Sequence, residues 1–234
     1  MNQRRILVIC DDVWHPAEII EKGFGYLADE TLSFDFVRTA KDILTPEMLS
    51  EYPIIFCCKG NSINAANREP WFEAGVTEVG PEEIRDYIEK GGIYVVLHAA
   101  SAVDPAWVAD DPRFREPAEA YVRLIGCRFH GHPLRCPVTV SVVNPEHPIM
   151  AGVSDFTERD EHYQLEITAP YVTTLFETSS EPGGQGVPGG FLFPLGAGRV
   201  VVISPGHTLS VWKNPSYQRI LRNLIDYYTG GADQ

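Results

Sequence analysis

The chain alternates short apolar runs with more polar segments. The most apolar run, 93–97, has five apolar residues in a row and follows the pair Gly91-Gly92. A continuous run of this length predicts a strand buried on both faces of a parallel sheet. Apolar runs at 6–10 and 53–59 predict further strands, and the segment 17–27 after the first of them predicts a helix. We therefore expect an α/β fold.

The second half of the chain adds different strand patterns. Residues 137–143 alternate in polarity, and a further strand is predicted at 172–178. Two apolar runs, 191–195 and 199–204, flank Gly196-Ala197-Gly198 and predict a β-hairpin. The segment 179–190 is rich in Gly, Pro and Ser, which predicts a flexible hairpin or flap.

The last helix has clear boundaries. Asn214 is a typical N-cap, Pro215 suits the first helical position, and Gly230 suits the position after the end. One apolar stripe predicts that this helix packs on the sheet: Tyr217, Ile220, Leu221, Leu224, Ile225 and Tyr228. No internal repeat or linker interrupts the sequence, so we expect residues 1–234 to form a single domain.

Polar residues follow three of the predicted strands. His98 ends the central run and is followed by the small residues Ala99, Ala100 and Ser101, which permit a tight turn. Asp12 and His15 follow the first strand, and His207 follows the strand at 199–204. In open α/β sheets, ligands bind at the carboxyl edge of the strands. A histidine at a strand end is also often a packed structural residue, so position alone does not decide its role.

Composition excludes several classes of partner. The net charge is −13 and no basic cluster is present, so nucleic acid and anionic membranes would be repelled. No apolar run approaches the roughly 20 residues of a membrane span, and the first apolar run is too short for a signal peptide. Five cysteines without CxxC spacing do not form a disulfide framework. We expect a cytoplasmic protein.

Other candidate residues carry weaker signals. Cys57 and Cys58 end a predicted strand and invite a nucleophile interpretation, but the pattern favours small core residues. His130 and His132 are two residues apart, as a metal pair in a strand would be, but Gly131 and Pro133 favour a loop. The segment 160–163 combines two acids, a histidine and a tyrosine, which is a dense set of polar groups. The alternative interpretation of this segment is a solvated turn.

The sequence resembles the trehalose-utilisation (ThuA-like) family. The resemblance covers most of residues 90–228 and is carried by these ordered segments: Gly91–Ser101, Ile125–Pro133, His147-Pro148-Ile149 with Gly152, Asp160–Tyr163, Gly198–His207 and Trp212–Tyr227. It implies a flavodoxin-like three-layer sandwich of the class I glutamine amidotransferase-like type, with a mostly parallel sheet and a β-hairpin. It also implies a link to carbohydrate utilisation.

Glutamine hydrolysis does not follow from the resemblance. That chemistry needs a cysteine after the central strand, a histidine base and an acid that orients the base. Here His98-Ala99-Ala100 stands at the turn, so the thiol is missing. His207 lies near where the amidotransferase histidine would fall, but the neighbouring glutamate is absent, and Cys57 lies on a different strand. The chain is not expected to be a glutamine amidotransferase.

The remaining polar residues predict one site. We expect His98, Glu161 and His207 to be catalytic, and the substrate to contact six further residues: Asp12, Trp14, His15, His132, Tyr163 and Trp212. Aromatic side chains, with Trp71 and Phe129 also considered, could stack on a sugar, although core packing must account for several of them. A distance above about 12 Å between His98 and His207 would exclude a shared site.

Three interpretations of this site stay open. A divalent metal such as Zn²⁺ could be held by His98, His132, Glu161 and His207, with His15 as an alternative or outer ligand. The same groups could act as general acid and base on a sugar without metal. The chain could also be a non-catalytic sugar-binding or assembly module that kept the fold and lost the nucleophile. The expected partner is a small-molecule carbohydrate, and the long connection at 61–80 could serve a homo-oligomer.

Overall fold

The computed structural model describes residues 3–61, 70–107 and 112–230. Its main sheet has nine strands in the order β2-β1-β3-β4-β11-β10-β9-β6-β7. The parallel part consists of β1 (Arg4–Ile9), β2 (Leu32–Val37), β3 (Ile54–Cys57), β4 (Ile93–Leu97) and β11 (Gly198–Ile203). The antiparallel part adds β10 (Gly184–Leu195), β9 (Thr173–Ser180), β6 (Cys136–Val142) and β7 (Phe156–Asp160). A separate two-stranded sheet pairs β5 (Cys127–Phe129) with β8 (Leu165–Ile167).

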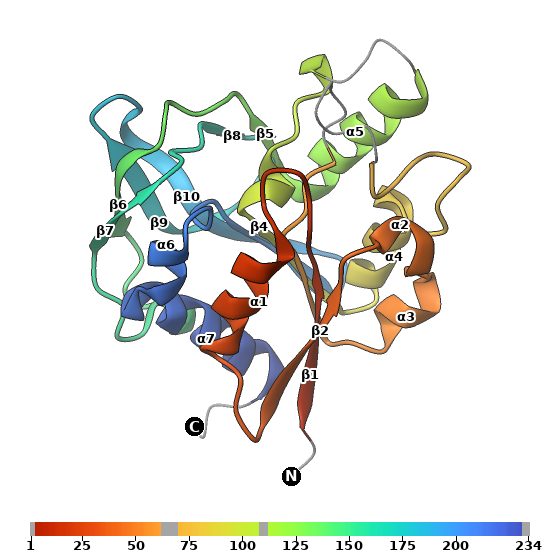
Figure 1. Cartoon of the computed structure of the whole chain (residues 1–234), viewed down its shortest axis with the longest axis horizontal. Coiled ribbons are helices and arrows are strands. Elements are labelled where there is room, and N and C mark those ends of the chain that lie inside the picture. Colours follow the sequence, from red (N-terminus) through yellow and green to blue (C-terminus); the bar gives the residue numbers. More distant parts are fainter. Residues whose placement is uncertain (1–2, 62–69, 108–111, 231–234) are drawn as a thin grey trace.

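Helices cover both faces of the main sheet (Figure 1). One face packs against α1 (Ala17–Gly25), α6 (Leu209–Lys213) and α7 (Pro215–Thr229). The other packs against α2 (Ala40–Ile43), α3 (Pro46–Ser50), α4 (Pro81–Glu89) and α5 (Pro112–Ile125). Three short 3₁₀ helices complete the described elements: η1 (His98–Ser101), η2 (Pro105–Trp107) and η3 (Pro148–Met150). The expected α/β three-layer sandwich is confirmed, as a mixed sheet with a parallel core.

The central strand explains why both layers are apolar. All five residues of β4 are buried. Alternate side chains of a strand point to opposite faces, and Val95 accordingly joins the core beneath α1 and α7, whereas Tyr94 and Val96 join the core beneath α4 and α5. The Tyr94 hydroxyl lies 3.1 Å from that of Tyr121, so this polar group is paired although it is buried.

The antiparallel part extends beyond the expected hairpin. The β10–β11 hairpin is present, and β9, β6 and β7 continue the sheet from it. Most of the glycine-rich segment 179–190 is not a free flap, because β10 begins at Gly184 and pairs with β9 along it. Gly190 is needed in this pairing, since a Cβ there would lie 2.1 Å from the ring of Phe176. The segment therefore forms a hairpin paired within the sheet rather than a flap outside it.

Two other segments differ from the sequence-based expectations. The segment 160–163 is not a solvated turn, because Asp160, His162 and Tyr163 are 1–2% exposed. The connection at 61–80 lies partly outside the described residues, and its described aromatic residues Trp71 and Phe72 are buried rather than at a surface.

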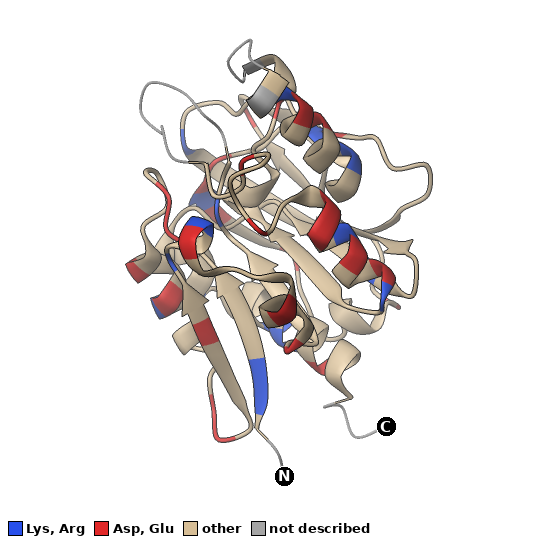
Figure 2. Cartoon of the chain, turned by 90° about the vertical axis from the view of Figure 1, so that its right-hand side faces the viewer, with Lys and Arg blue, Asp and Glu red and all other residues tan. Residues whose placement is uncertain are grey.

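The final helix follows the sequence signals closely. The Asn214 side chain accepts hydrogen bonds from the backbone N–H groups of Ser216 and Tyr217, and Gly230 ends the helix in the left-handed conformation. Figure 2 shows charged residues of both signs on the helices and loops of one side of the molecule, with basic residues lying among acidic ones. Among the described helices, none is both long enough and apolar enough to cross a bilayer.

Candidate metal centre

A turn after β4 presents the first side chain of the site. His98 is the first residue of η1 and has a φ of 44°, a left-handed conformation that is uncommon for residues other than glycine. The Ser101 hydroxyl donates to the His98 carbonyl (2.7 Å), which closes the turn. Ala99 and Ala100 are fully buried. Their small side chains allow the turn to pack closely against the rest of the protein. The left-handed backbone conformation of His98 is strained, and strain of this kind is often found at functional sites.

The His98 ring is oriented by a backbone carbonyl. Its Nδ1 lies 2.7 Å from the carbonyl oxygen of Ser204, which can only accept a hydrogen bond, so Nδ1 carries the proton. In the neutral ring, Nε2 then presents a lone pair. This Nε2 lies 3.3 Å from His207 Nδ1 and 3.5 Å from Glu161 Oε2. Tyr163 stacks on the face of the His98 ring at a centroid distance of 4.3 Å.

The loop after β1 orients His15 in a similar way. Asp12 Oδ1 accepts hydrogen bonds from His15 Nδ1 (2.8 Å) and from the backbone N–H groups of Trp14 and His15 (2.9 Å each). Asp12 Oδ2 accepts from the backbone N–H of Gly60 (2.8 Å). His15 Nε2 is buried and has no hydrogen-bond partner among the described residues. The His15 ring lies edge-on to both His98 and His207, at centroid distances of 4.9 and 5.0 Å.

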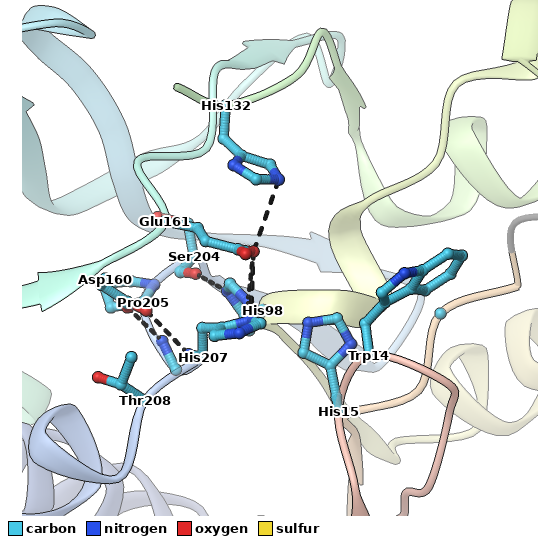
Figure 3. A network of polar contacts seen from close by, with 12 residues as sticks. Trp14, His15, His98, His132, Asp160, Glu161, Ser204, Pro205, His207 and Thr208 are labelled. Atoms are coloured by element: carbon cyan, nitrogen blue, oxygen red, sulfur yellow. Dashed lines mark hydrogen bonds and ion pairs between the residues drawn. The ribbon is translucent and has the colours of Figure 1, made fainter. Parts of the chain in front are cut away.

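Asp160 and Gly206 position the other two groups. The Asp160 carboxylate accepts hydrogen bonds from the backbone N–H groups of Gly206 (2.8 Å) and His207 (3.0 Å), which ties the end of β7 to the turn after β11. Gly206 has a φ of 150°, and a Cβ there would lie 2.8 Å from the Leu97 side chain. Glycine is therefore required at this close approach. As a result, Glu161 Oε2 lies 3.2 Å from His207 Nδ1 (Figure 3).

Three groups of the cluster have the spacing of metal ligands, and His15 lies close to them. An atom of each of His15, His98, Glu161 and His207 lies within 4.8 Å of the others. A tetrahedral ion with metal–ligand bonds of about 2.0–2.1 Å separates its ligand atoms by about 3.3 Å. The three distances among His98, Glu161 and His207 are 3.2, 3.3 and 3.5 Å. A cavity of about 20 Å³, the size of one water molecule, borders the three imidazoles.

The electrostatics of the cluster favour a cation. Burial opposes ionisation of Glu161, but its hydrogen bonds with His207 and His98 outweigh burial and hold its pKa well below the usual range. Burial likewise opposes protonation of His98, but the Glu161 hydrogen bond and the Asp160 charge raise its pKa above the usual value. Burial dominates at His15 and lowers its pKa, despite the hydrogen bond to Asp12. The cluster therefore combines a carboxylate that stays ionised with at least one imidazole that stays neutral at neutral pH.

His132 lies beside this set rather than in it. Its Nε2 is 3.6 Å from Glu161 Oε2, its side chain is 33% exposed, and its Nδ1 donates to its neighbour Pro133 (2.8 Å). It stacks on Tyr163 at a centroid distance of 5.5 Å, and Figure 3 shows it beyond Glu161 from His98 and His207. Among the described residues, the group that could hold a metal contains His15 and omits His132. This group contains His15, which the sequence offered as an alternative ligand, and the assignment of metal ligands stays a prediction.

The aromatic residues that were predicted to contact a sugar differ in their exposure to solvent. Trp14 is 43% exposed and adjoins His15. Four other aromatic residues considered as sugar-stacking surfaces are 5% exposed or less: Trp71, Phe129, Tyr163 and Trp212. Trp212 packs in the core, where its indole N–H donates to the Gly206 carbonyl (2.8 Å) and supports the turn that carries His207.

Cys57 and Cys58 are buried core residues, and burial raises the pKa of both thiols. The core interpretation of these cysteines is thus confirmed.

Two groups that orient the site were not recognised from the sequence as orienting groups. Asp12 was expected to contact substrate, but it is occupied by four hydrogen bonds within the protein. Its place three residues before His15 is the only local signal of that arrangement. The Ser204 carbonyl has no sequence signal at all, because every residue type supplies a backbone carbonyl.

The fold and site define an α/β protein with a mixed sheet, in which a histidine and carboxylate cluster lies at the carboxyl edge of the parallel strands. Over residues 5–228 the chain matches the family model described as ThuA, trehalose utilisation. The chain belongs to this family, and membership implies a role in carbohydrate utilisation. A search of curated protein sequences finds no match.

Solved structures support the fold. A ThuA-like protein from Bacteroides uniformis ATCC 8492 is similar over 99% of this chain and 94% of its own, with a TM-score of 0.71 and 19% identity. A cytoplasmic protein from Salmonella typhimurium LT2 is similar over 96% and 99%, with a TM-score of 0.66 and 12% identity. A β-galactosidase from Rahnella sp. R3 is similar over 97% of this chain but only 31% of its own, with a TM-score of 0.64 and 11% identity.

Proposed function

We propose that this protein is a metal-dependent enzyme of carbohydrate utilisation that acts on a sugar or sugar derivative. The ion would be held by His15, His98, Glu161 and His207. One observation carries the proposal: His15 and His98 each have Nδ1 fixed by an acceptor, which leaves Nε2 of each neutral ring as the nitrogen that can bind an ion, in a cluster that also contains a carboxylate. Asp12 holds His15 and the Ser204 carbonyl holds His98 in this way. Metal-binding histidines in proteins are oriented by such partners.

The ligand types favour Zn²⁺ or another divalent first-row ion. Imidazole nitrogens suit such ions, and one carboxylate lowers the charge cost of holding a dication. When bound, an ion of this kind polarises a substrate oxygen or lowers the pKa of a bound water. The protein itself contributes fixed ligands, since Asp12, Ser204 and Asp160 hold three of the four ligand-bearing segments. Because the cysteine nucleophile is absent, no thioester intermediate is part of this proposal.

The carbohydrate class rests on family membership, because the family is described by trehalose utilisation. We further propose that the chain acts as one domain in the cytoplasm. Its nine-stranded sheet draws on both halves of the sequence, and its cysteines are all free thiols. One similar structure is that of a protein described as cytoplasmic.

Metal analysis tests the proposal. Protein purified without a histidine tag, measured by elemental analysis, should contain close to one divalent ion per chain, which a chelator removes. His98→Ala and Glu161→Ala should each lose most of it, because each removes a ligand from the closely spaced set of three. His130→Ala is the matched control, since this exposed histidine pairs with Glu166 outside the cluster.

The other interpretations predict different results. Turnover of a sugar that depends on His98 but needs no metal would favour acid–base chemistry by the same imidazoles. Sugar binding without turnover in both metal-loaded and metal-free protein would favour a binding module. Substoichiometric metal that is unchanged in Glu161→Ala would refute the metal centre.

A further inference from the structure

A buried aromatic side chain contacts the cluster without being one of the proposed ligands. Tyr163 is 2% exposed and stands two residues after Glu161. Its ring stacks on the His98 imidazole at a centroid distance of 4.3 Å, with the two planes 25° apart. Among the described residues, the Tyr163 hydroxyl has no hydrogen-bond partner. The contact with the cluster is therefore made by the ring and not by the hydroxyl group.

The His98 ring needs a second constraint besides the Ser204 carbonyl. That carbonyl lies 2.7 Å from Nδ1, but a single hydrogen bond tolerates a range of angles. The outer side-chain torsion of histidine also has broad energy wells, so neighbouring groups must decide the plane of the ring and with it the direction of Nε2. The stacked Tyr163 ring supplies this constraint, because tilting the imidazole would drive it into a closely packed neighbour.

The segment that carries Tyr163 is itself fixed. The Tyr163 backbone N–H donates to the Glu161 carbonyl (3.1 Å), and the next backbone N–H, that of Gln164, donates to the Gly131 carbonyl (2.8 Å). The Phe129 ring packs against the Tyr163 ring at a centroid distance of 4.6 Å. One short turn thus presents a proposed ligand together with the ring that stacks on a second proposed ligand, and contacts with β5 and the loop after it hold this turn.

Two observations separate Tyr163 from an ordinary core residue, although it belongs to one of the two core clusters. First, its ring lies nearly parallel to a polar imidazole, whose own ring nitrogens face other groups of the site. Second, this imidazole stands on a strained backbone with a φ of 44°, and such strain persists only where the surrounding contacts fix the residue. The stack is one of these contacts.

From these contacts, and resting on the proposed function, we infer that Tyr163 is a positioning residue of the metal centre. Its ring fixes the plane of the His98 imidazole, so that Nε2 faces Glu161 and His207 before an ion binds. The Ser204 carbonyl fixes Nδ1, and the two constraints together define one orientation of the ring. A ligand that is already ordered loses less freedom on binding, so the ion is held more tightly.

Zn²⁺ affinity, measured by competition with a chromophoric chelator, tests the inference, and urea unfolding of each metal-free variant measures its stability. Tyr163→Leu should weaken Zn²⁺ binding about 3- to 10-fold, the effect of losing one aromatic pair. Tyr163→Phe should stay within about 2-fold of wild type, because it keeps the ring and loses only the hydroxyl. If Tyr163→Leu does not fold, Tyr163→Met takes its place, since methionine adapts its shape to a core gap.

Phe72→Leu is the matched control. Phe72 is a buried aromatic residue of the same core cluster, and its ring contacts are with Trp71 and Tyr121 rather than with the histidines. This variant should lose stability and keep its Zn²⁺ affinity. The visible absorption of bound Co²⁺ gives a second measurement, because it responds to the geometry of the ligands. Its bands should shift in Tyr163→Leu and stay unchanged in Tyr163→Phe and Phe72→Leu.

The outcomes separate this inference from the proposed function. If wild type binds Zn²⁺ and the non-aromatic variant of Tyr163 binds it equally well with unchanged Co²⁺ bands, the inference alone is overturned. It is also overturned if Tyr163→Phe loses as much affinity as Tyr163→Leu, or if Phe72→Leu does, since the ring of Tyr163 would then have no specific role. Failure of wild-type protein to hold a metal would overturn the proposed function and this inference with it.

Discussion

Asp12→Asn is the sharpest test of how the fold prepares the cluster. The Asp12 side chain is 2% exposed and accepts four hydrogen bonds at 2.8–2.9 Å, two of them from His15. Burial opposes its ionisation, but the hydrogen bond from His15 and those from Gly60 and Trp14 lower its pKa, so it is a carboxylate at neutral pH. Asparagine has nearly the same shape but carries no charge, and it places an NH₂ group where one oxygen was.

The magnitude follows from those contacts. If the side-chain oxygen of the new asparagine points toward His15, its side-chain NH₂ group takes the place of Asp12 Oδ2. In the wild type this oxygen accepts a hydrogen bond from the Gly60 N–H at 2.8 Å, so the variant brings two donors together. One buried donor left unpaired costs about 1–3 kcal/mol of folding free energy. The weaker hold on His15 should reduce metal affinity about 10- to 100-fold, because that is the usual effect of changing an outer partner of a metal-binding histidine. This corresponds to about 1.4–2.7 kcal/mol of binding free energy.

Two measurements separate these effects. Competition with a chromophoric chelator at constant pH measures the Zn²⁺ affinity, and urea unfolding of the metal-free protein measures stability. Asp35→Asn is the matched control, because Asp35 pairs with Arg5 and Tyr52 away from the cluster. If Asp12→Asn loses stability but binds Zn²⁺ within about 2-fold of wild type, then His15 is not a ligand that Asp12 orients.

Three further predictions address the other groups of the cluster. Glu161→Gln keeps the shape but removes the anion, so elemental analysis should find most of the metal lost; full occupancy would contradict the assignment. His132→Ala should keep its metal within error, because His132 lies outside the closely spaced set, and loss of half the metal would place it among the ligands. In metal-free protein, the raised pKa of His98 means that its contribution to stability is complete below about pH 6.5 and is lost as pH rises through that pKa. The difference in unfolding free energy between wild type and His98→Gln should therefore shrink toward alkaline pH, and a constant difference in urea titrations would refute this. The metal-loaded protein should show the opposite trend, since its ligands must lose protons to bind.

Much of the fold could be predicted because its signals are local. The run 93–97 is apolar because both faces of β4 are covered, and a continuous apolar pattern records this directly. Asn214, Pro215 and Gly230 mark the ends of α7 because helix ends need particular backbone and side-chain groups. The extension of the sheet by β7 was not predicted, because its pattern, Phe156–Asp160, is short and mostly polar. Such a strand is stabilised by pairing with β6 rather than by its own composition.

The sequence also placed histidines at the ends of two strands and predicted that they meet at one edge of the sheet, whereas the direct pairing of the two strands is a feature of the tertiary structure. His98 follows β4 and His207 follows β11, and these strands pair directly, which brings their nitrogens to 3.3 Å. This distance is well below the limit of about 12 Å for a shared site. Only the tertiary structure decided which other imidazole joins them. His15 and His132 both lie in loops, and the direction of a loop side chain depends on distant partners such as Gly60, bound through Asp12.

Contacts with distant residues also decide which aromatic residues are exposed at the site. Trp14 and Trp212 were equally plausible as sugar contacts, because the sequence records only that each is a tryptophan near a histidine-bearing segment. The packing of α6 against α1 and β7 buries Trp212, whereas the hydrogen bonds of Asp12 hold the backbone of a loop on which Trp14 stays exposed. Periodicity along the chain determined the layers of this protein. Ring orientation and exposure at its site were decided by contacts between residues far apart in the sequence, which no local pattern encodes.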